Sequence, residues 1–272
     1  MVRGRNHFYF VKLHVILLLL IYDCRLHAAV LTYDGCMSDS TNSYKLGGWC
    51  FLFYRNSSWA VSTPTQDGAQ TVCHPHGNLA VGVTYKMLET YKTKYTSSSV
   101  LYGWLALLRN GSSVATVGWI WKTLLPNGKY ATFPAIMSNI PWGPIEPNNL
   151  GGREDRATLR YTVGVIDVPN DIAVDGSYPL AVICQFAPQK WTYTQRGHGL
   201  FTNAAYRIAQ MTAVRDICIR QCHWSVFCIS VAFNPTTNDC QIYAVSPEDS
   251  RFSGSVTASS TYEWHIRDGM EY

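Results

Sequence analysis

The placement of the cysteines constrains the fold of this chain more than any other feature. The chain has 272 residues and nine cysteines, of which Cys24 lies in an N-terminal segment expected to be removed. The remaining eight form an even set, as is typical of complete disulfide pairing in a secreted protein. They fall into two groups of four: Cys36, Cys50, Cys73 and Cys184, then Cys218, Cys222, Cys228 and Cys240. This split predicts two domains.

The N-terminal segment has the pattern of a signal peptide. Residues 15–22 are apolar, follow the basic residues Arg3, Arg5 and Lys12, and precede Leu-His-Ala-Ala at 26–29. We expect cleavage near residue 28 or 29, so that residues 1–29 are the signal peptide. The apolar run is too short to span a bilayer, and no later segment is long enough. The sequence therefore predicts a secreted, extracellular protein without a membrane span.

The charge of the mature chain is close to neutral. The formal net charge is +4, but residues 1–29 contain four Lys or Arg and one Asp, which leaves +1 for the rest. A nucleic-acid-binding domain needs a basic stripe. The composition therefore argues against nucleic acid as a partner.

A polar stretch at residues 146–155, Glu-Pro-Asn-Asn-Leu-Gly-Gly-Arg-Glu-Asp, is the candidate binding loop. Carboxylate and amide oxygens on a stiff turn are the ligands that calcium prefers, and calcium needs six to eight of them. Asn170 and Asp171 offer two more beyond a predicted strand at 157–161. The alternative is an ordinary solvated turn, since a four-residue motif recurs by chance.

The order of these motifs resembles a known family. Trp142, the 146–148 Glu-Pro-Asn and the 180–184 Leu-Ala-Val-Ile-Cys look like the sugar-binding half of a C-type lectin domain, and the Trp-Leu-Ala-Leu at 104–107 looks like its core strand. The resemblance covers about half of the chain. It implies an α+β domain over residues 30–187, with two helices, mixed β-sheets and a long irregular calcium loop. Glu-Pro-Asn implies preference for mannose- or fucose-type glycans, and a cis bond before Pro147.

The resemblance also implies a ligand set. It assigns calcium to Glu146, Asn148, Glu154, Asn170 and Asp171. It assigns sugar contacts to Glu146, Asn148, Glu154 and Asn170. Two departures from the family stand out. The usual loop disulfide is absent, because Arg156 and Val174 occupy its positions. A count without gaps places Ile166 and Asp167, instead of Asn170 and Asp171, at the ion; we prefer the intact Asn-Asp pair, since insertions in loops are tolerated.

Helices and strands of the first domain follow from local signals. Thr63 as N-cap with proline next predicts a helix to about Cys73, and a second helix opens at Thr84 with Met87, Leu88, Tyr91 and Tyr95 on one apolar face. Strands are expected at 49–54, 101–108, 117–121, 157–161 and 182–186. Residues 123–144 are expected to be irregular, and long irregular stretches are usually functional.

The first four cysteines pair naturally in this layout. Cys36 and Cys50 bracket a polar turn, which predicts a hairpin closed by its own disulfide. Cys73 on the first helix and Cys184 in the last strand would join the two ends of the domain. Asn56 and Asn110 begin Asn-x-Ser sequons and are candidate N-glycosylation sites.

The second group of cysteines belongs to a smaller domain at 191–268, after a linker at 188–190 and before a tail at 269–272. A helix at 213–222 would place Cys218 and Cys222 on one face, and strands at 228–233 and 240–245 form a hairpin. Zinc is the rival explanation, but the spacing lacks paired Cys-x-x-Cys knuckles and the compartment is oxidising.

The same pattern resembles a PAN/apple domain without its outer disulfide. The resemblance implies that Cys218 pairs with Cys240 and Cys222 with Cys228. Such domains bind proteins or carbohydrates, so an extracellular protein partner is possible through this half.

Catalytic motifs are missing from the sequence. It has no Gly-x-Ser-x-Gly, no His-Glu-x-x-His and no phosphate loop. Glu146 and Glu154 could be posed as a glycosidase pair, but the sequence around them lacks the apolar residues that raise a general acid's pKa. We expect a binding protein and not an enzyme. The second hypothesis is a lectin-like protein that has lost calcium and binds proteins.

Overall fold

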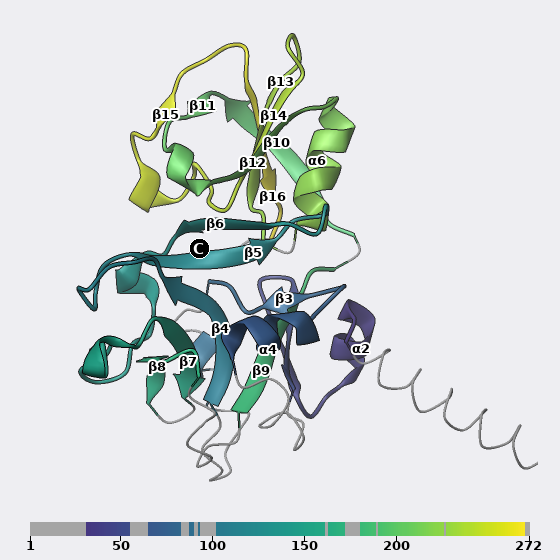
Figure 1. Ribbon diagram of the computed structural model, residues 1–272. Helices are drawn as coiled ribbons and strands as arrows, with labels where there is room; N and C mark the ends of the chain where they lie inside the picture. The colour runs from purple at the N-terminus through teal and green to yellow at the C-terminus, as the bar shows by residue number, and fades with distance from the viewer. Residues whose placement is uncertain are drawn as a thin grey trace, which may run out of the picture.

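The computed structural model describes residues 31–54, 65–82, 87–89, 92, 102–160, 163–171, 180–188, 190–225 and 227–269. The expected signal peptide, Asn56 and most of the helix expected from Thr84 lie outside these ranges. Within that helix Met87 and Leu88 are described, and both are buried. The architecture is α+β, as expected, with few helices and several antiparallel strands (Figure 1). None of the helices in the described ranges is long and apolar enough to cross a membrane.

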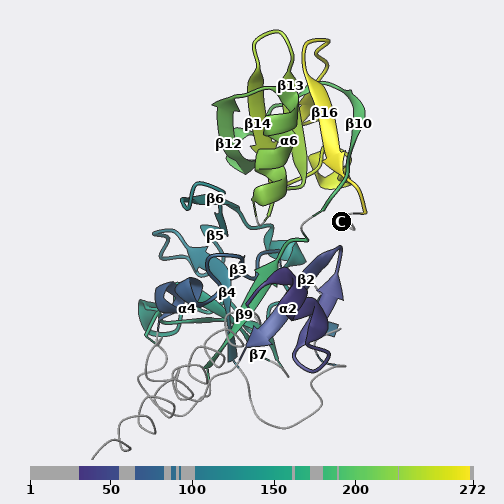
Figure 2. The ribbon, with the colours of Figure 1, turned by 90° about the vertical axis from the view of Figure 1, so that its right-hand side faces the viewer.

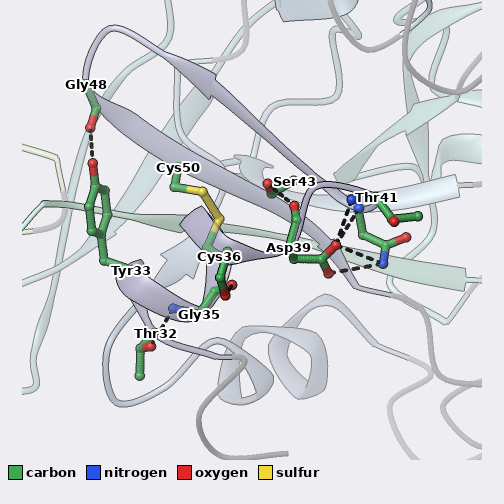
Figure 3. The surroundings of a disulfide bond; sticks show 11 residues. Thr32, Tyr33, Gly35, Cys36, Asp39, Thr41, Ser43, Gly48 and Cys50 are labelled. Atoms are coloured by element: carbon green, nitrogen blue, oxygen red, sulfur yellow. Dashed lines mark hydrogen bonds between the residues drawn. A yellow bond between two sulfur atoms is a disulfide. The ribbon is translucent and has the colours of Figure 1, made fainter.

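The chain begins with a short helix tied to a hairpin. Helix α2 (Tyr33–Ser38) is capped by the side chain of Thr32, and the hairpin β1 (Ser43–Leu46) and β2 (Trp49–Tyr54) follows. The Cys36–Cys50 disulfide links α2 to β2 (Figure 3). The two cysteines pair as expected, but the bond joins a helix to a strand, whereas the sequence had predicted that it closes a hairpin. The hairpin turns at Gly47 and Gly48, both with positive φ, a conformation that glycine adopts without steric cost.

The main sheet surrounds one buried strand, β4. The strand order is β1-β2-β9-β4-β5-β6, with β3 on β9 and β7 on both β4 and β8. The bounds are β3 (Asn78–Leu79), β4 (Tyr102–Arg109), β5 (Trp119–Leu124), β6 (Tyr130–Pro134), β7 (Arg156–Arg160), β8 (Gly164–Val168) and β9 (Leu180–Phe186). A Cβ on Gly103 would lie 2.7 Å from Ile183 and 2.9 Å from Phe53, so glycine permits this close packing.

Helix α4 (Gln66–Val72) covers the main sheet, but it starts later than expected. Its N-cap is Thr65, whose hydroxyl accepts from the N–H of Gly68 at 3.1 Å, so the prediction of Thr63 was wrong by two residues. The Gln66 side chain donates to main-chain carbonyls of β4. The helix ends at Cys73, which is bonded to Cys184 in β9. This disulfide joins the two ends of the first half, as expected.

Residues 123–144 are less irregular than expected. β6 lies inside this stretch and pairs with β5, and the 3-10 helix η1 (Met137–Asn139) follows it. The sequence Tyr-Ala-Thr-Phe-Pro contains β-formers, but the surrounding Pro, Asn and Gly concealed them. The irregular loop therefore runs from the end of η1 to β7, interrupted by η2 (Leu150–Gly152).

The second half is one helix on an antiparallel sheet, with strand order β10-β16-β13-β14-β12 (Figure 2). The strands are β10 (Tyr193–His198), β12 (Arg207–Thr212), β13 (Ser230–Asn234), β14 (Asp239–Tyr243) and β16 (Glu263–Arg267), and a small pair is β11 (Leu200–Phe201) with β15 (Val256–Thr257). Helix α6 (Arg215–Trp224) packs on β13 and β14. Disulfides Cys218–Cys240 and Cys222–Cys228, the pairs that the resemblance implied, tie this region together.

The two halves are packed against each other. One hydrophobic cluster contains buried residues from both sides of residues 188–190, including Phe51 and Trp121 on one side and Ile208 and Val231 on the other. The β5–β6 hairpin lies beneath the second half in Figure 1. Phe227 of the second half stacks on Phe133 of β6, with ring centroids 5.5 Å apart. The halves therefore share part of one core.

Candidate functional site

The candidate loop is anchored on the main chain of strand β8. The N–H of Val165 donates to Pro141 O and the N–H of Gly143 donates to Val165 O, both at 2.8 Å. Gly164 has φ +121, and a Cβ there would lie 2.5 Å from Pro141 O. Only glycine therefore allows the loop to approach the strand so closely. The Trp142 ring packs on Trp119, 5.1 Å between centroids.

Asp167 of β8 organises the loop. Its side chain is 2% exposed, and its two oxygens accept from the main-chain N–H groups of Asn148 at 3.0 Å and Asn149 at 2.8 Å. The Glu146–Pro147 peptide bond is cis. Hydrogen bonds to a carboxylate are among the stronger ones in proteins. Asp167 therefore fixes the main chain on which Glu146 and Asn148 are carried.

Three of the expected ligands lie around this carboxylate. The Asn148 side-chain amide donates to Glu146 Oε1 at 2.9 Å, and a Glu154 carboxylate oxygen accepts from the N–H of Leu150. The other Glu146 oxygen, Oε2, is buried and has no hydrogen-bond partner among the described residues. A buried acceptor without a partner is costly. The Glu146 carboxylate therefore lacks a hydrogen bond or ion contact at Oε2.

Burial and the neighbouring charge of Asp167 raise the pKa of two of these acids, Glu146 and Glu154. Burial raises the pKa of Glu146 to about 8. The Asp167 carboxylate acts in the same direction, because it can accept a hydrogen bond from the protonated form of Glu146 and because its charge repels the ionised form, and the charge of Glu154 adds to this. Burial also raises the pKa of Glu154; the N–H of Leu150 opposes this, the Asp167 charge adds to it, and Arg109 opposes it. The sequence-based expectation that neither Glu lies where its pKa would rise was therefore wrong. The main cause is burial by segments distant in the sequence, to which the neighbouring charge of Asp167 adds.

Arg109 is a residue of the site that sequence reasoning missed. It ends strand β4, is 6% exposed, and its Nη2 donates to the main-chain carbonyl of Glu154 at 2.8 Å and to Asn149 Oδ1. The main-chain N–H of Arg109 also donates to Asp155 O at 2.9 Å. The sequence did contain a signal for this residue, because Arg109 is the one charged residue at the end of the otherwise apolar segment Trp-Leu-Ala-Leu-Leu-Arg.

Asn170 and Asp171 contact residues other than Glu146, Asn148 and Glu154. Asn170 Oδ1 accepts from the N–H of Gln66 at 3.0 Å, and Asp171 pairs with Arg153 at 3.0 Å. Strands β7 and β8 pair without an insertion, with Asp167 opposite Ala157. Asp167, the acid reached by the count without gaps, is therefore the one that contacts the loop, through the N–H groups of Asn148 and Asn149.

The remaining sequence-predicted positions are the sequon at Asn110 and the loop position Val174. Asn110 is exposed at the end of β4, where its N–H donates to Gly118 O at 2.8 Å. The sequon there is accessible to a glycan, and its occupancy stays a prediction. Val174, like the rest of residues 172–179, lies outside the described ranges.

The donor chemistry of the loop fits a hard cation. Glu146, Glu154, Asp167 and Asn148 supply only oxygen ligands, and the unpartnered Glu146 Oε2 leaves an acceptor available. Within the described ranges, no three His, Cys, Asp or Glu side chains already converge as a metal site. Calcium binding would therefore require Asn148 and movement of the acids toward one another.

Comparison with known proteins gives structural likeness only. No protein-family model matches the chain, and no curated protein matches it. Human lithostathine is similar with 15% identity, TM-score 0.38, and coverage of 57% of this chain and 94% of that chain. The carbohydrate-recognition domain of mouse scavenger receptor C-type lectin is 18% identical, with TM-score 0.37 and coverage of 56% and 98%.

A third similar structure is a calcium-independent type II antifreeze protein, 18% identical, with TM-score 0.35 and coverage of 54% of this chain and 92% of that chain. At these identities and TM-scores the likeness carries no argument about function. The proposal below therefore rests on the residues of the loop.

Proposed function

We propose that this protein is an extracellular, calcium-dependent carbohydrate-binding protein whose site is the loop around Glu146. The observation that carries the proposal is the buried, unpartnered Oε2 of Glu146 beside two further acids, Glu154 and Asp167. Burial and the neighbouring charge of Asp167 destabilise the ionised forms of Glu146 and Glu154. A divalent cation removes that cost and gives the buried oxygen a partner.

The residues that would hold calcium are Glu146, Asn148, Glu154 and Asp167. Bound calcium supplies open positions for two neighbouring sugar hydroxyls. The carboxylates of Glu146 and Glu154 accept hydrogen bonds from these hydroxyls, and the Asn148 amide, released from Glu146, donates one. Mannose- or fucose-type glycans are the proposed ligands because the loop has the Glu-Pro-Asn order. The helix-on-sheet half, which resembles a PAN/apple domain, is proposed to bind a protein or a second glycan.

Calcium affinity is proposed to be low. Both Asp167 oxygens already accept main-chain N–H groups, and in the count without gaps Ile166 falls at the position of one oxygen ligand. The dissociation constant should therefore lie in the weak extracellular range, about 10⁻⁴ to 10⁻³ M.

A calcium-independent protein-binding module is the second candidate. Asp167 and Arg109 hold the loop through protein hydrogen bonds alone, and Ile145 and Leu150 on it are 88% and 74% exposed. Exposed apolar side chains grouped on one loop are typical of contact surfaces.

Thermal unfolding with and without millimolar calcium, together with retention on mannose resin, separates the two candidates. The lectin proposal predicts a higher Tm with calcium, because a ligand that binds only the folded state stabilises it. It also predicts retention that a chelator reverses. An unchanged Tm together with no retention favours the protein-binding module.

A further inference from the structure

Large apolar side chains are exposed at two places in the described ranges. One group lies at residues 214–224, in and next to helix α6. The other group lies at or beside the candidate loop and consists of Val114, Val117, Ile145 and Leu150. Single exposed apolar residues are normal on a protein surface, but several at one place are typical of a contact surface. We call these four residues the apolar rim.

Two residues of the apolar rim belong to the loop itself. Ile145 directly precedes Glu146, and its side chain is 88% exposed. The main-chain N–H of Leu150 donates to a carboxylate oxygen of Glu154, while the Leu150 side chain is 74% exposed. Both apolar side chains therefore extend from the same main chain that carries the proposed calcium ligands.

The other two residues of the apolar rim lie on a neighbouring turn. The side-chain amide of Asn149 donates to the main-chain carbonyl of Ser113 at 3.2 Å, which holds this turn beside the loop. The N–H of Val117 donates to Val114 O at 3.1 Å, and the two valine side chains are 53% and 55% exposed. The apolar rim is therefore built from two segments that a hydrogen bond joins.

The main chain of Ile145 is strained. Its φ is +64, and a β-branched residue rarely adopts a positive φ because its Cβ crowds the main chain. Contacts in a core do not offset this strain, since the side chain is almost fully exposed. Residues in such conformations are often found at ligand-binding sites. The strain is a second observation, independent of the exposed apolar surface, that indicates a ligand at this point.

The loop and the apolar rim together fit an amphiphilic ligand. The loop offers carboxylate and amide groups, whereas the rim consists of aliphatic side chains without polar atoms. Sugar hydroxyls suit the first surface, and an apolar group suits the second, because its burial removes apolar area from water. A free sugar would leave the rim in water, and a ligand with both parts would cover both surfaces.

We propose that the ligand of the loop is a mannose-type glycoside whose anomeric oxygen carries an apolar group, and that the apolar rim binds this group. The inference rests on the proposed calcium and sugar site and names the class of glycoside that this site takes. Ile145 and Leu150 contact the apolar group next to the sugar, and Val114 and Val117 extend the contact. A soluble alkyl or aryl glycoside and a glycolipid share this chemistry.

The test is a ligand-observed NMR titration of the full chain with two glycosides in millimolar calcium. Methyl α-D-mannopyranoside lacks the apolar group, and hexyl α-D-mannopyranoside carries one and is used below the concentration at which it forms micelles. We expect the hexyl glycoside to bind about tenfold more tightly, since burial of about two methylene groups is enough for this gain. A chelator should release both glycosides.

Two variants of the apolar rim and one control locate the bound hexyl group. Leu150→Ser should lower the preference for the hexyl over the methyl glycoside to about threefold or less, because it removes apolar area but keeps the main-chain N–H. Ile145→Gly should lower the preference similarly, with a Tm no lower than that of the wild type, because glycine adopts a positive φ without strain. Ile217→Ser on α6, at a side chain that is 38% exposed, should keep the full preference.

Cosedimentation with phosphatidylcholine vesicles distinguishes the two sources of the ligand. If vesicles that contain a long-chain alkyl mannoside bind the wild-type chain, and Leu150→Ser weakens this binding, the ligand is a glycolipid. Binding of the hexyl glycoside without binding to these vesicles assigns a soluble glycoside. Binding to vesicles without the mannoside would need no sugar and would overturn the proposal.

Failure of the apolar rim and failure of the sugar site give different results. If neither glycoside binds, the proposed calcium and sugar site fails, and the inference fails with it. If both glycosides bind equally and a chelator releases them, the sugar site stands and the apolar rim is refuted. The rim is also refuted if the hexyl glycoside binds as tightly in the presence of chelator, or if neither Leu150→Ser nor Ile145→Gly lowers the preference.

Discussion

The carboxylate of Asp167 accepts a hydrogen bond from the main-chain N–H of Asn148, 19 positions earlier in the chain, at 3.0 Å. The same carboxylate accepts from the next N–H, that of Asn149, at 2.8 Å. A buried acid that holds two successive amides sets the direction of the loop between them and β7. The binding residues thus depend on a strand that follows them in the sequence.

Asp167→Asn should disturb the loop more than the same change at Asp171. The amide keeps one acceptor oxygen but turns the other into a donor facing an N–H, so one charge-assisted bond is lost and one contact becomes repulsive. Loss of such bonds costs about 1.5–3 kcal/mol. Urea unfolding measures the stability, and mannose retention measures the site. Asp171→Asn is the matched control: Asp171 is half exposed and pairs with the exposed Arg153, so a small effect is expected. Equal losses in both variants would contradict the role of Asp167.

Asn148→Asp should separate ion binding from sugar binding. The change keeps an oxygen at this position but removes the amide that now donates to Glu146 at 2.9 Å. We expect the calcium-dependent rise in Tm to remain and mannose retention to fall by about tenfold or more, as for a lost hydrogen bond to a polar ligand. Calcium titration by thermal shift and mannose affinity chromatography are the two readouts. Full mannose retention in this variant would remove Asn148 from the sugar site.

The pH dependence of stability should reflect Glu146. Its pKa is about 8 in the folded protein and about 4.3 when unperturbed, so between these values the folded state binds more protons than the unfolded state. Stability therefore falls as pH rises through this window, and the loss is complete above about pH 8. Glu146 is partly exposed, so solvent screening keeps the effect well below the value that the full shift implies.

Glu146→Gln removes this titration and should flatten the stability profile between about pH 4.5 and 8, with calcium absent. The neutral amide should make the variant more stable than wild type above pH 8. Glu248→Gln is a suitable control, because Glu248 lies in the second half, away from the loop. Urea unfolding across this pH range measures the effect. A wild-type profile that rises with pH in this window would show that the three acids do not repel one another as inferred.

The elements that sequence reasoning could place are those fixed by local chemistry. The strands around Trp104 and Ile183 are continuous apolar runs, and the cysteine spacing on α6 places two thiols on one face. The expected extracellular compartment and the even number of cysteines predicted that all eight would pair. The four disulfides join the pairs that were expected. The strands and the helix face need only neighbouring residues to be understood, whereas the pairing within the second group of cysteines came from the resemblance to a PAN/apple domain.

What sequence reasoning could not place depends on tertiary contacts. Whether Asp167 or Asn170 contacts the N–H of Asn148 depends on the pairing of β7 with β8, which a sequence does not display. Likewise Thr65, rather than Thr63, caps α4, because Gln66 is held by the carbonyls of Leu105 and Leu107 on the sheet. Arg109 reaches the loop only because β4 ends beside it. Local signals were overridden in each case by hydrogen bonds between distant segments.

The packing of Arg267 predicts how the two halves respond to a cut in the linker. Arg267, in β16, is 1% exposed; its guanidinium stacks on Trp191 and lies 5.2 Å from the ring centroid of Trp49 in the first half. Its Nη1 donates to Cys228 O at 2.8 Å. Burial lowers the pKa of Arg267 to about 9. The contact with aromatic rings, and not an ion pair in the described ranges, therefore offsets the burial of this charge.

Sequence analysis alone suggests that proteolysis near residues 188–193 separates the halves. With the shared core in view, we expect the wild-type fragments to stay associated after such a cut, on size-exclusion chromatography without denaturant. Arg267→Ala should release them and cost about 2–5 kcal/mol, because it leaves a cavity between Trp49 and Trp191. Arg267→Met keeps the length of the side chain without its charge, and replacing a buried charge by a packed apolar group is often close to neutral. Fragments that separate in the wild-type protein would show that the contacts between the halves contribute little to holding them together.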